Sequence, residues 1–218
     1  MNKNSLNPFK NLLRPEVTTS MLLALFSSYK DPRGRIHDFH KNGILTSVKQ
    51  GVYLIHNDLV PCPYSKLLLA NMIFGPSYIS LETALSYYGF IPEKVESITS
   101  ISFAQNKIFN TAVGIFTYHH ISNKIYPYHV TLQNIDDNVS ILMATPEKAL
   151  LDFLYFREKK GTFSNEKDYV NYILNSYRLD LTTIQKTISF LKLKKLAKLY
   201  NKKHISWFVV ELFRRLKK

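Results

Sequence analysis

The sequence predicts an α+β fold, and three features support this class. Apolar residues recur at helical spacing in several segments, alternating segments typical of strands lie between them, and a glycine turn separates two β-rich runs near the N-terminus. A chain of 218 residues is long enough to bury a core and to form one large or two small domains.

Composition narrows the class of protein. Apolar residues make up 45% and aromatic residues 13% of the chain, which is typical of a folded protein. The longest apolar runs fall short of the roughly 18 residues that span a bilayer, and the first residues lack the apolar stretch of a signal peptide. Cys62 is the only cysteine, so paired-cysteine zinc sites and internal disulfides are excluded. We expect a soluble cytoplasmic protein without metal, cofactor or membrane contact.

Charge is distributed unevenly. Residues 1–56 carry a net charge of +5, residues 57–185 carry −2, and residues 186–218 carry +10. Two basic ends around a near-neutral middle are typical of a protein that meets a polyanion, most commonly nucleic acid. The alternative is a solvated lysine-rich surface.

The N-terminal segment predicts two helices and a hairpin. Residues 18–20 can cap a first helix that ends near Tyr29. Asp31 and Pro32 suit the start of a short basic second helix, which Gly43 can end. Two β-rich runs then flank the turn at 49–51. Helix, short basic helix and hairpin is the order of elements in a winged helix-turn-helix, which we predict over residues 1–57. A complete domain of this kind needs one more helix, which we expect at residues 6–13. A small helix–hairpin module without a DNA partner remains the alternative.

In a winged helix, the basic helix enters the major groove and the hairpin contacts the DNA backbone. We expect base-edge contacts from the N-terminal part of this helix and phosphate contacts from the surrounding lysines. The predicted base-facing residues are Arg33, Arg35 and His37, and the predicted phosphate-binding residues are Lys30, Lys41 and Lys49.

Residues 56–65 contain two prolines and form the expected junction to a second domain, 58–185. Helices are predicted at 65–74 and from a cap at Ser80 to Gly89, separated by a break at 75–80. Strands are predicted at 96–103, 111–119 and 138–144, with a loop and a possible short strand at 124–137. The last part, 186–218, is expected to be a basic helical tail packed on the second domain, which either complements helix ends or adds a DNA or docking contact.

The segment "ATPEKALLDFLY" at 144–155 raises the question of catalysis. Glu147, Lys148 and Asp152 resemble a nuclease or phosphate site, but Glu147 and Lys148 are neighbours on a helix and point about 100° apart. Thr145 as cap and Pro146 at the first helical position explain the segment as a helix start. His119, His120 and His129 lack metal-ligand spacing. We therefore expect no enzyme.

Three blocks of the chain resemble a known family. They are residues 31–55, 75–102 and 144–155, with "YISLETALSYYG" the most specific stretch. Together they resemble the AbiEi-type antitoxins of bacterial type IV, abortive-infection toxin–antitoxin systems. The resemblance implies an N-terminal winged-helix domain and an AbiEi-like antitoxin domain at 58–185. The family's motif residues fall on Tyr78, Ser80, Glu82, Tyr88, Gly89, Thr145, Pro146, Glu147, Lys148 and Asp152, none of them expected to be catalytic.

The same resemblance implies a function. Such proteins bind double-stranded DNA of their own promoter, repress their operon and counteract a nucleotidyltransferase-like toxin, and direct contact with the toxin is not implied. Two alternatives stay open: a protein-interaction module that sequesters a toxin without specific DNA binding, and an enzyme acting on nucleic acid or on the toxin.

Overall fold

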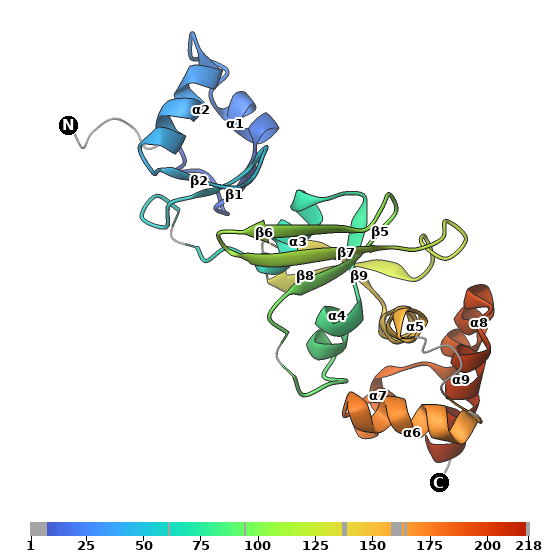
Figure 1. The fold of residues 1–218 in the computed structure, drawn as a ribbon. Helices are drawn as coiled ribbons and strands as arrows, with labels where there is room; N and C mark the ends of the chain where they lie inside the picture. The colour runs from blue at the N-terminus through green and yellow to red at the C-terminus, as the bar shows by residue number, and fades with distance from the viewer. Residues whose placement is uncertain are drawn as a thin grey trace.

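The computed structural model describes residues 8–60, 62–93, 95–136, 139–157, 163 and 165–216. It shows a mixed α/β protein with two sheets, in agreement with the predicted α+β class. An N-terminal lobe holds the smaller sheet, a larger lobe holds the other, and the two chain ends lie at opposite ends of the molecule (Figure 1).

The N-terminal lobe combines two helices with a three-stranded antiparallel sheet of order β1-β3-β2. Thr18 and Asp31 cap the two helices by accepting hydrogen bonds from the backbone of Met21 and Gly34. Gly51 has a φ of +86° in the hairpin turn, as the sequence predicts. The elements are β1 (Glu16–Thr18), α1 (Thr19–Leu25), α2 (Pro32–Lys41), β2 (Leu45–Lys49) and β3 (Val52–Ile55).

Two features of this lobe differ from the sequence expectation. β1 was not expected, because three residues are too few to show an alternating pattern and its pairing with β3 is long-range. The helix expected at 6–13 is also not found: residues 8–11 form a turn, and residues 6 and 7 lie outside the described residues. Phe9 in this turn is nonetheless buried against the rings of Phe26 and Phe39, at 5.9 and 5.4 Å.

Both faces of the small sheet are packed against other parts of the protein. One face belongs to the core of the N-terminal lobe, which includes Leu45 and Ile55. The other presents Val48, Val52 and Leu54, which belong to the core of the larger lobe. The hairpin is therefore held against the second lobe on its outer side.

The larger lobe is built on a six-stranded sheet of order β6-β7-β5-β4-β9-β8. Tyr118 on β7 donates to Ala70 on α3, whereas Tyr78 on β4 donates to Asp152 on α5, so these helices cover opposite faces (Figure 1). The strands are β4 (Ser77–Ile79), β5 (Ile98–Ser102), β6 (Lys107–Thr111), β7 (Gly114–His120), β8 (Val130–Asp136) and β9 (Val139–Ala144). The helices that cover them are α3 (Lys66–Ile73), α4 (Leu81–Tyr87) and α5 (Pro146–Phe156).

Three of these strands lie outside the predicted ones. β4 falls in the predicted break because it is fully buried between two neighbours, so no polar face marks it. The sequence pattern does not predict β6, and β8 is a full edge strand of seven residues where the pattern predicts at most a short strand. The predicted strands correspond to β5, β7 and β9 with shifted ends.

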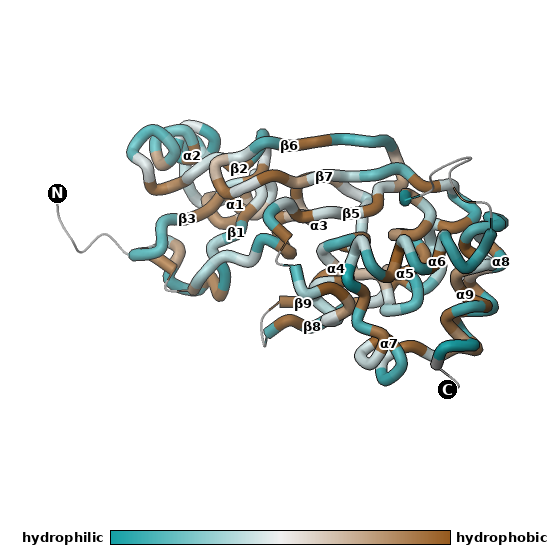
Figure 2. Tube along the Cα trace, turned by 60° about the horizontal axis from the view of Figure 1, so that its bottom comes forward, coloured by the Kyte–Doolittle hydropathy of each residue, from teal (hydrophilic) through white to brown (hydrophobic). Residues whose placement is uncertain are grey.

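Four helices complete the described chain: α6 (Glu166–Ser176), α7 (Leu181–Thr187), α8 (Phe190–Tyr200) and α9 (Lys203–Leu216). α8 packs on α5 and on α9, and α9 packs on α6. Apolar stretches run through the larger sheet and these helices, whereas α2 is mainly hydrophilic (Figure 2). No helix in the described ranges combines the length and apolarity that crossing a membrane requires.

Candidate functional site

A polar groove opens between α1, α2 and the β2–β3 hairpin. Its volume is about 530 Å³. Arg33 and His37 of α2 line it together with Ser47 and Gln50 of the hairpin, and all four side chains are exposed. The remaining lining residues are Thr19, Leu23, Ile36, His40 and Tyr53.

Helical spacing explains why these side chains meet. Arg33, His37 and His40 are four and three residues apart, so they lie along one face of α2. Phe39 on the opposite side anchors the helix in the core of the lobe. The ring of His40 contacts that of Tyr53 at 6.2 Å, which joins the helix to the hairpin strand β3.

The other predicted DNA-binding residues lie elsewhere. The guanidinium of Arg35 stacks over the ring of Phe39 at 4.7 Å, on the side of α2 away from the groove. Lys30 and Lys41 are exposed at the two ends of α2. Lys49 instead donates a 2.7 Å hydrogen bond to the carbonyl of Ile73 on α3, at the junction of the lobes. The structure thus brings two of the six residues into the groove.

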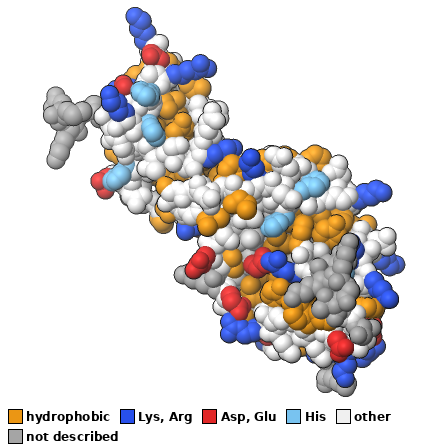
Figure 3. Space-filling view, in the orientation of Figure 1, with side chains coloured by type: hydrophobic (Ala, Val, Ile, Leu, Met, Phe, Trp, Pro, Cys, Tyr) orange, Lys and Arg blue, Asp and Glu red, His pale blue; other side chains and the backbone are white. Residues whose placement is uncertain are grey.

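Sequence reasoning missed several groove residues. His40 continues the face of Arg33 and His37, so the helical period could have found it. Ser47 and Gln50 come from the hairpin, and only the packing of the hairpin beside α2 brings them there. Figure 3 shows basic and histidine side chains on the N-terminal lobe, with acidic ones among them.

The motif residues of the resemblance assemble at a different place, inside the larger lobe. The ammonium of Lys148 donates to Asp152 at 3.0 Å, to the Tyr200 hydroxyl at 3.0 Å and to the Ile125 carbonyl at 3.1 Å. All three of its protons are therefore used. Neither Lys148 nor Asp152 is accessible to solvent.

Asp152 is equally well satisfied. Its carboxylate accepts hydrogen bonds from Tyr200 at 2.5 Å, from Ser80 at 2.8 Å and from Tyr78 at 3.1 Å, besides that from Lys148. Ser80 stands at the start of α4, as predicted, but makes no side-chain cap because its hydroxyl is directed to Asp152. The ion pair thus ties β4 to α5 and α8.

Burial dominates the electrostatics of this cluster. Desolvation lowers the pKa of Lys148, and the neighbouring Asp152 acts in the opposite direction. Desolvation and then the charge of Asp152 raise the pKa of Tyr78 and of Tyr200 well above the usual value. A cluster closed to solvent, with every donor of Lys148 engaged, suits a structural core and offers no room for a substrate.

The other motif residues also hold elements together. Thr145 caps α5 and Pro146 opens it, as the sequence predicts. Glu147 is buried and accepts a 2.9 Å hydrogen bond from the backbone of Ser189 at the start of α8. The remaining contacts are those of Tyr88 with the Ala144 carbonyl at 2.8 Å and of Glu82 with Arg157, while Gly89 ends α4 with a φ of +72°.

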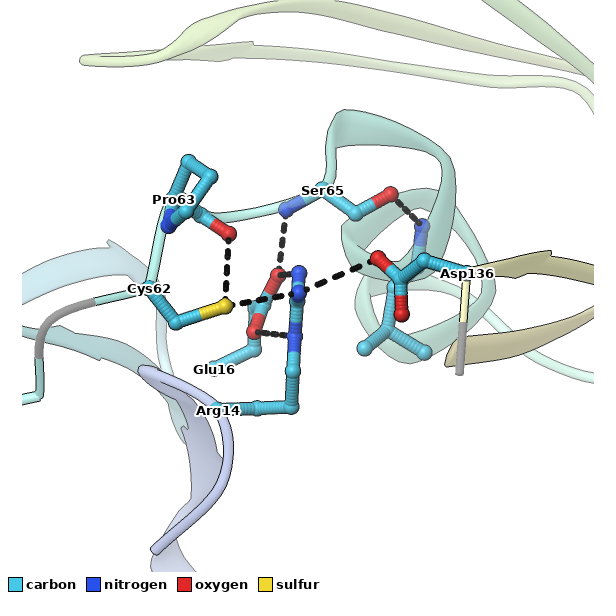
Figure 4. A network of polar contacts seen from close by, with 7 residues as sticks. Arg14, Glu16, Cys62, Pro63, Ser65 and Asp136 are labelled. Atoms are coloured by element: carbon cyan, nitrogen blue, oxygen red, sulfur yellow. Dashed lines mark hydrogen bonds and ion pairs between the residues drawn. The ribbon is translucent and has the colours of Figure 1, made fainter. Parts of the chain in front are cut away.

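A second polar network joins the two lobes (Figure 4). Arg14 forms an ion pair with the buried Glu16 at 2.9 Å and reaches Cys62 at 3.1 Å and Asp136 at 3.4 Å. Glu16 also accepts a hydrogen bond from the backbone of Ser65, just before α3. Burial acts to lower the pKa of Arg14, but the hydrogen bond and charge of Glu16, together with Cys62 and Asp136, outweigh it and raise that pKa. The N-terminal lobe is thus fixed to the linker and to β8.

Comparison with known proteins adds no assignment. No protein-family model matches the chain, and no curated protein matches it. Within the described ranges, no three His, Cys, Asp or Glu side chains are grouped so that they could hold a metal ion.

Proposed function

We propose that this protein binds double-stranded DNA through the groove beside α2 and acts as an AbiEi-type antitoxin that represses its own operon. The observation that carries the DNA-binding part is the groove itself. Arg33, near the start of α2, and His37, one turn further along, share one open surface with Ser47 and Gln50 of the hairpin.

The connectivity of the N-terminal lobe supports a winged-helix assignment. β1, α1, α2, β2 and β3 follow one another, and the sheet order β1-β3-β2 sets a hairpin beside the second helix. In this assignment α2 is the recognition helix and the β2–β3 hairpin is the wing. The turn at 8–11, with buried Phe9, takes the place of the first helix.

Charge and position support the role of each residue. Arg33 is the second residue of α2, and the first residues of a recognition helix reach base edges. Its guanidinium can bind guanine through two hydrogen bonds. Lys30 and Lys41 are exposed at the two ends of α2 and suit phosphate contacts. Arg35 and Lys49 are left out, since one faces away and the other joins the lobes.

The antitoxin part of the proposal is supported by the resemblance of residues 31–55, 75–102 and 144–155 to the AbiEi-type family. Its proposed target is a nucleotidyltransferase-like toxin encoded with it, and its site of action is the cytoplasm. The buried positions of Lys148 and Asp152 favour a scaffold role for the motif over catalysis.

Fluorescence anisotropy tests the proposal. The probes are the DNA upstream of the protein's own reading frame and a scrambled duplex of equal length, each over a salt series. We expect tighter binding to the first by a factor of about 10³ or more. Equal and steeply salt-dependent binding to both would mean that the net charge of +13 attracts any polyanion, and a toxin-sequestering module without specific DNA binding would replace the proposal.

Two matched variants locate the reading surface. Arg33→Ala should lose about 1–3 kcal/mol of discrimination between the two duplexes. Arg35→Ala removes the same charge from the other side of α2, so it should weaken binding to both duplexes by the same factor. Circular dichroism confirms that each variant is folded. Equal losses on both duplexes for Arg33→Ala would refute its base-reading role.

A further inference from the structure

A second groove lies at the far end of the molecule, between α8 and α9. It has a volume of about 490 Å³, and its described lining comes from these two helices alone. The lining residues are Phe190, Leu191, Lys194, Ala197 and Lys198 from α8, and Ser206, Val209, Val210 and Phe213 from α9.

The apolar side chains of this groove are unusually exposed. Leu191 is 66% exposed, Val210 51% and Phe213 43%. The buried faces of α8 and α9 lie elsewhere, with Leu193 and Leu212 fully inside the core. Contiguous exposed apolar surface of this kind marks interaction sites in soluble proteins.

Unneutralised positive charge borders the groove. Lys194 and Lys198 are exposed and lie one helical turn apart on α8. Neither forms an ion pair with any described residue. Glu211 is the only acidic residue of α8 and α9, and it is already engaged by Arg214 at 2.7 Å and Arg215 at 2.9 Å. A ligand that carries carboxylates would complement this rim.

We propose that the groove between α8 and α9 docks an acidic amphipathic helix of a partner protein. The rings of Phe190 and Phe213 meet at 5.4 Å at one end, and Ala197 and Ser206 line the other. The groove therefore follows α8 from Phe190 to Lys198, a rise of about 12 Å over roughly two helical turns. Apolar side chains at i, i+3 or i+4 and i+7 of the partner fill it, and flanking carboxylates pair with Lys194 and Lys198.

Other occupants fit the groove less well. A second copy of the chain would bring two lysine rims together, and like charges oppose such a contact. A membrane surface favours protruding apolar side chains, whereas these line a hollow. Nucleic acid would complement the lysines but would leave Leu191 and Val210 without apolar partners.

The test uses the full-length protein and a labelled synthetic peptide of about 14 residues, long enough for the two turns and its own ends. Leucines at i, i+3 and i+7 form its apolar face and glutamates flank them. A scrambled peptide of equal composition is the control. We expect saturable binding of the first peptide, weakened by salt, and at least about tenfold weaker binding of the scrambled one.

Variants on the protein make the test specific. Val210→Glu, in the groove, should weaken peptide binding by about tenfold or more. Leu199→Glu, at an exposed position of α8 outside the groove, should change the affinity less than about threefold. The pair Lys194→Glu and Lys198→Glu should likewise weaken binding, and salt should no longer weaken it further, because the local attraction has become repulsion. The matched pair Lys192→Glu and Lys195→Glu lies outside the groove and should retain most of the affinity.

Several outcomes would overturn the inference. Equal binding of the two peptides would mean that only attraction between charges holds them, and absence of binding would refute the proposed docking site. Self-association in sedimentation velocity that Val210→Glu abolishes would assign the groove to a second copy, and anionic vesicles bound through Leu191 and Val210 would assign it to a membrane. Arg33→Ala should leave peptide binding intact, so the inference and the proposed DNA binding can fail separately.

Discussion

Removal of the Asp152 carboxylate tests the view that the motif residues form a structural core. Asp152→Ala leaves the Lys148 ammonium inside the larger lobe without its counter-charge, and Tyr78, Ser80 and Tyr200 without their acceptor. Breaking a buried ion pair in this way costs about 3–5 kcal/mol. The orphaned hydroxyl groups act in the same direction, at about 1–3 kcal/mol for each one that finds no other partner.

Urea unfolding followed by circular dichroism measures this loss. With a denaturant slope of about 2–3 kcal/mol/M, a loss of about 3–5 kcal/mol lowers the midpoint by about 1–2.5 M. The control is Glu93→Ala, which breaks the exposed ion pair with Arg178 and should leave the midpoint unchanged. The double variant Lys148→Met with Asp152→Leu removes both charges, so it should recover part of the lost stability.

One result would refute this reasoning. If Asp152→Ala shifted the midpoint as little as Glu93→Ala, the carboxylate could not be the buried partner of Lys148. A folded Asp152→Ala variant of unchanged stability that had lost antitoxin activity would instead point to a functional role at this position.

Three further predictions follow from other contacts. Burial raises the pKa of Tyr88 to about 12, against 10.0 for a free tyrosine. The stability that the protonated hydroxyl contributes below pH 10 is therefore lost as the pH rises from 10 to 12. Urea midpoints across this range should fall less steeply in Tyr88→Phe than in the wild type. Lys49→Ala removes a hydrogen bond to α3, so hydrogen exchange at the end of α3 should become faster, while the salt dependence of DNA binding stays unchanged. Lys41→Ala, by contrast, should lower the slope of that salt dependence by about 1. Glu147→Ala leaves the Ser189 amide at the start of α8 without its acceptor, which should cost about 0.5–2 kcal/mol by urea unfolding and quicken exchange in the first turn of α8, with DNA binding unaffected.

Local signals carried the correct part of the sequence prediction. Asp31 with Pro32 and Thr145 with Pro146 start helices where expected, because a cap and a first-turn proline act within four residues of each other. Gly51 likewise marks its turn through its own backbone preference. Such signals need no knowledge of distant parts of the chain.

The buried ion pair shows where the sequence falls short. A helix start explains Thr145 and Pro146, but it does not explain why Lys148 and Asp152 are inaccessible. Their shared partner Tyr200 lies 48 residues beyond Asp152, in a helix whose docking no local pattern reveals. β4 was missed for a related reason, since a central strand buried on both faces has no alternation to detect.

The chemistry that looks most reactive in the sequence is therefore the least available in the structure. Lys148 and Asp152 neutralise each other in the core, whereas Arg33 on α2 and Lys194 on α8 are exposed and line grooves. α2, which lines the first groove, lies at the opposite end of the molecule from α8 and α9, which line the second (Figure 1). If both proposals hold, DNA bound beside α2 and a peptide bound between α8 and α9 would not compete for space. A ternary complex of DNA, protein and acidic peptide in sedimentation velocity is the outcome this arrangement predicts, and displacement of the peptide by DNA would contradict it.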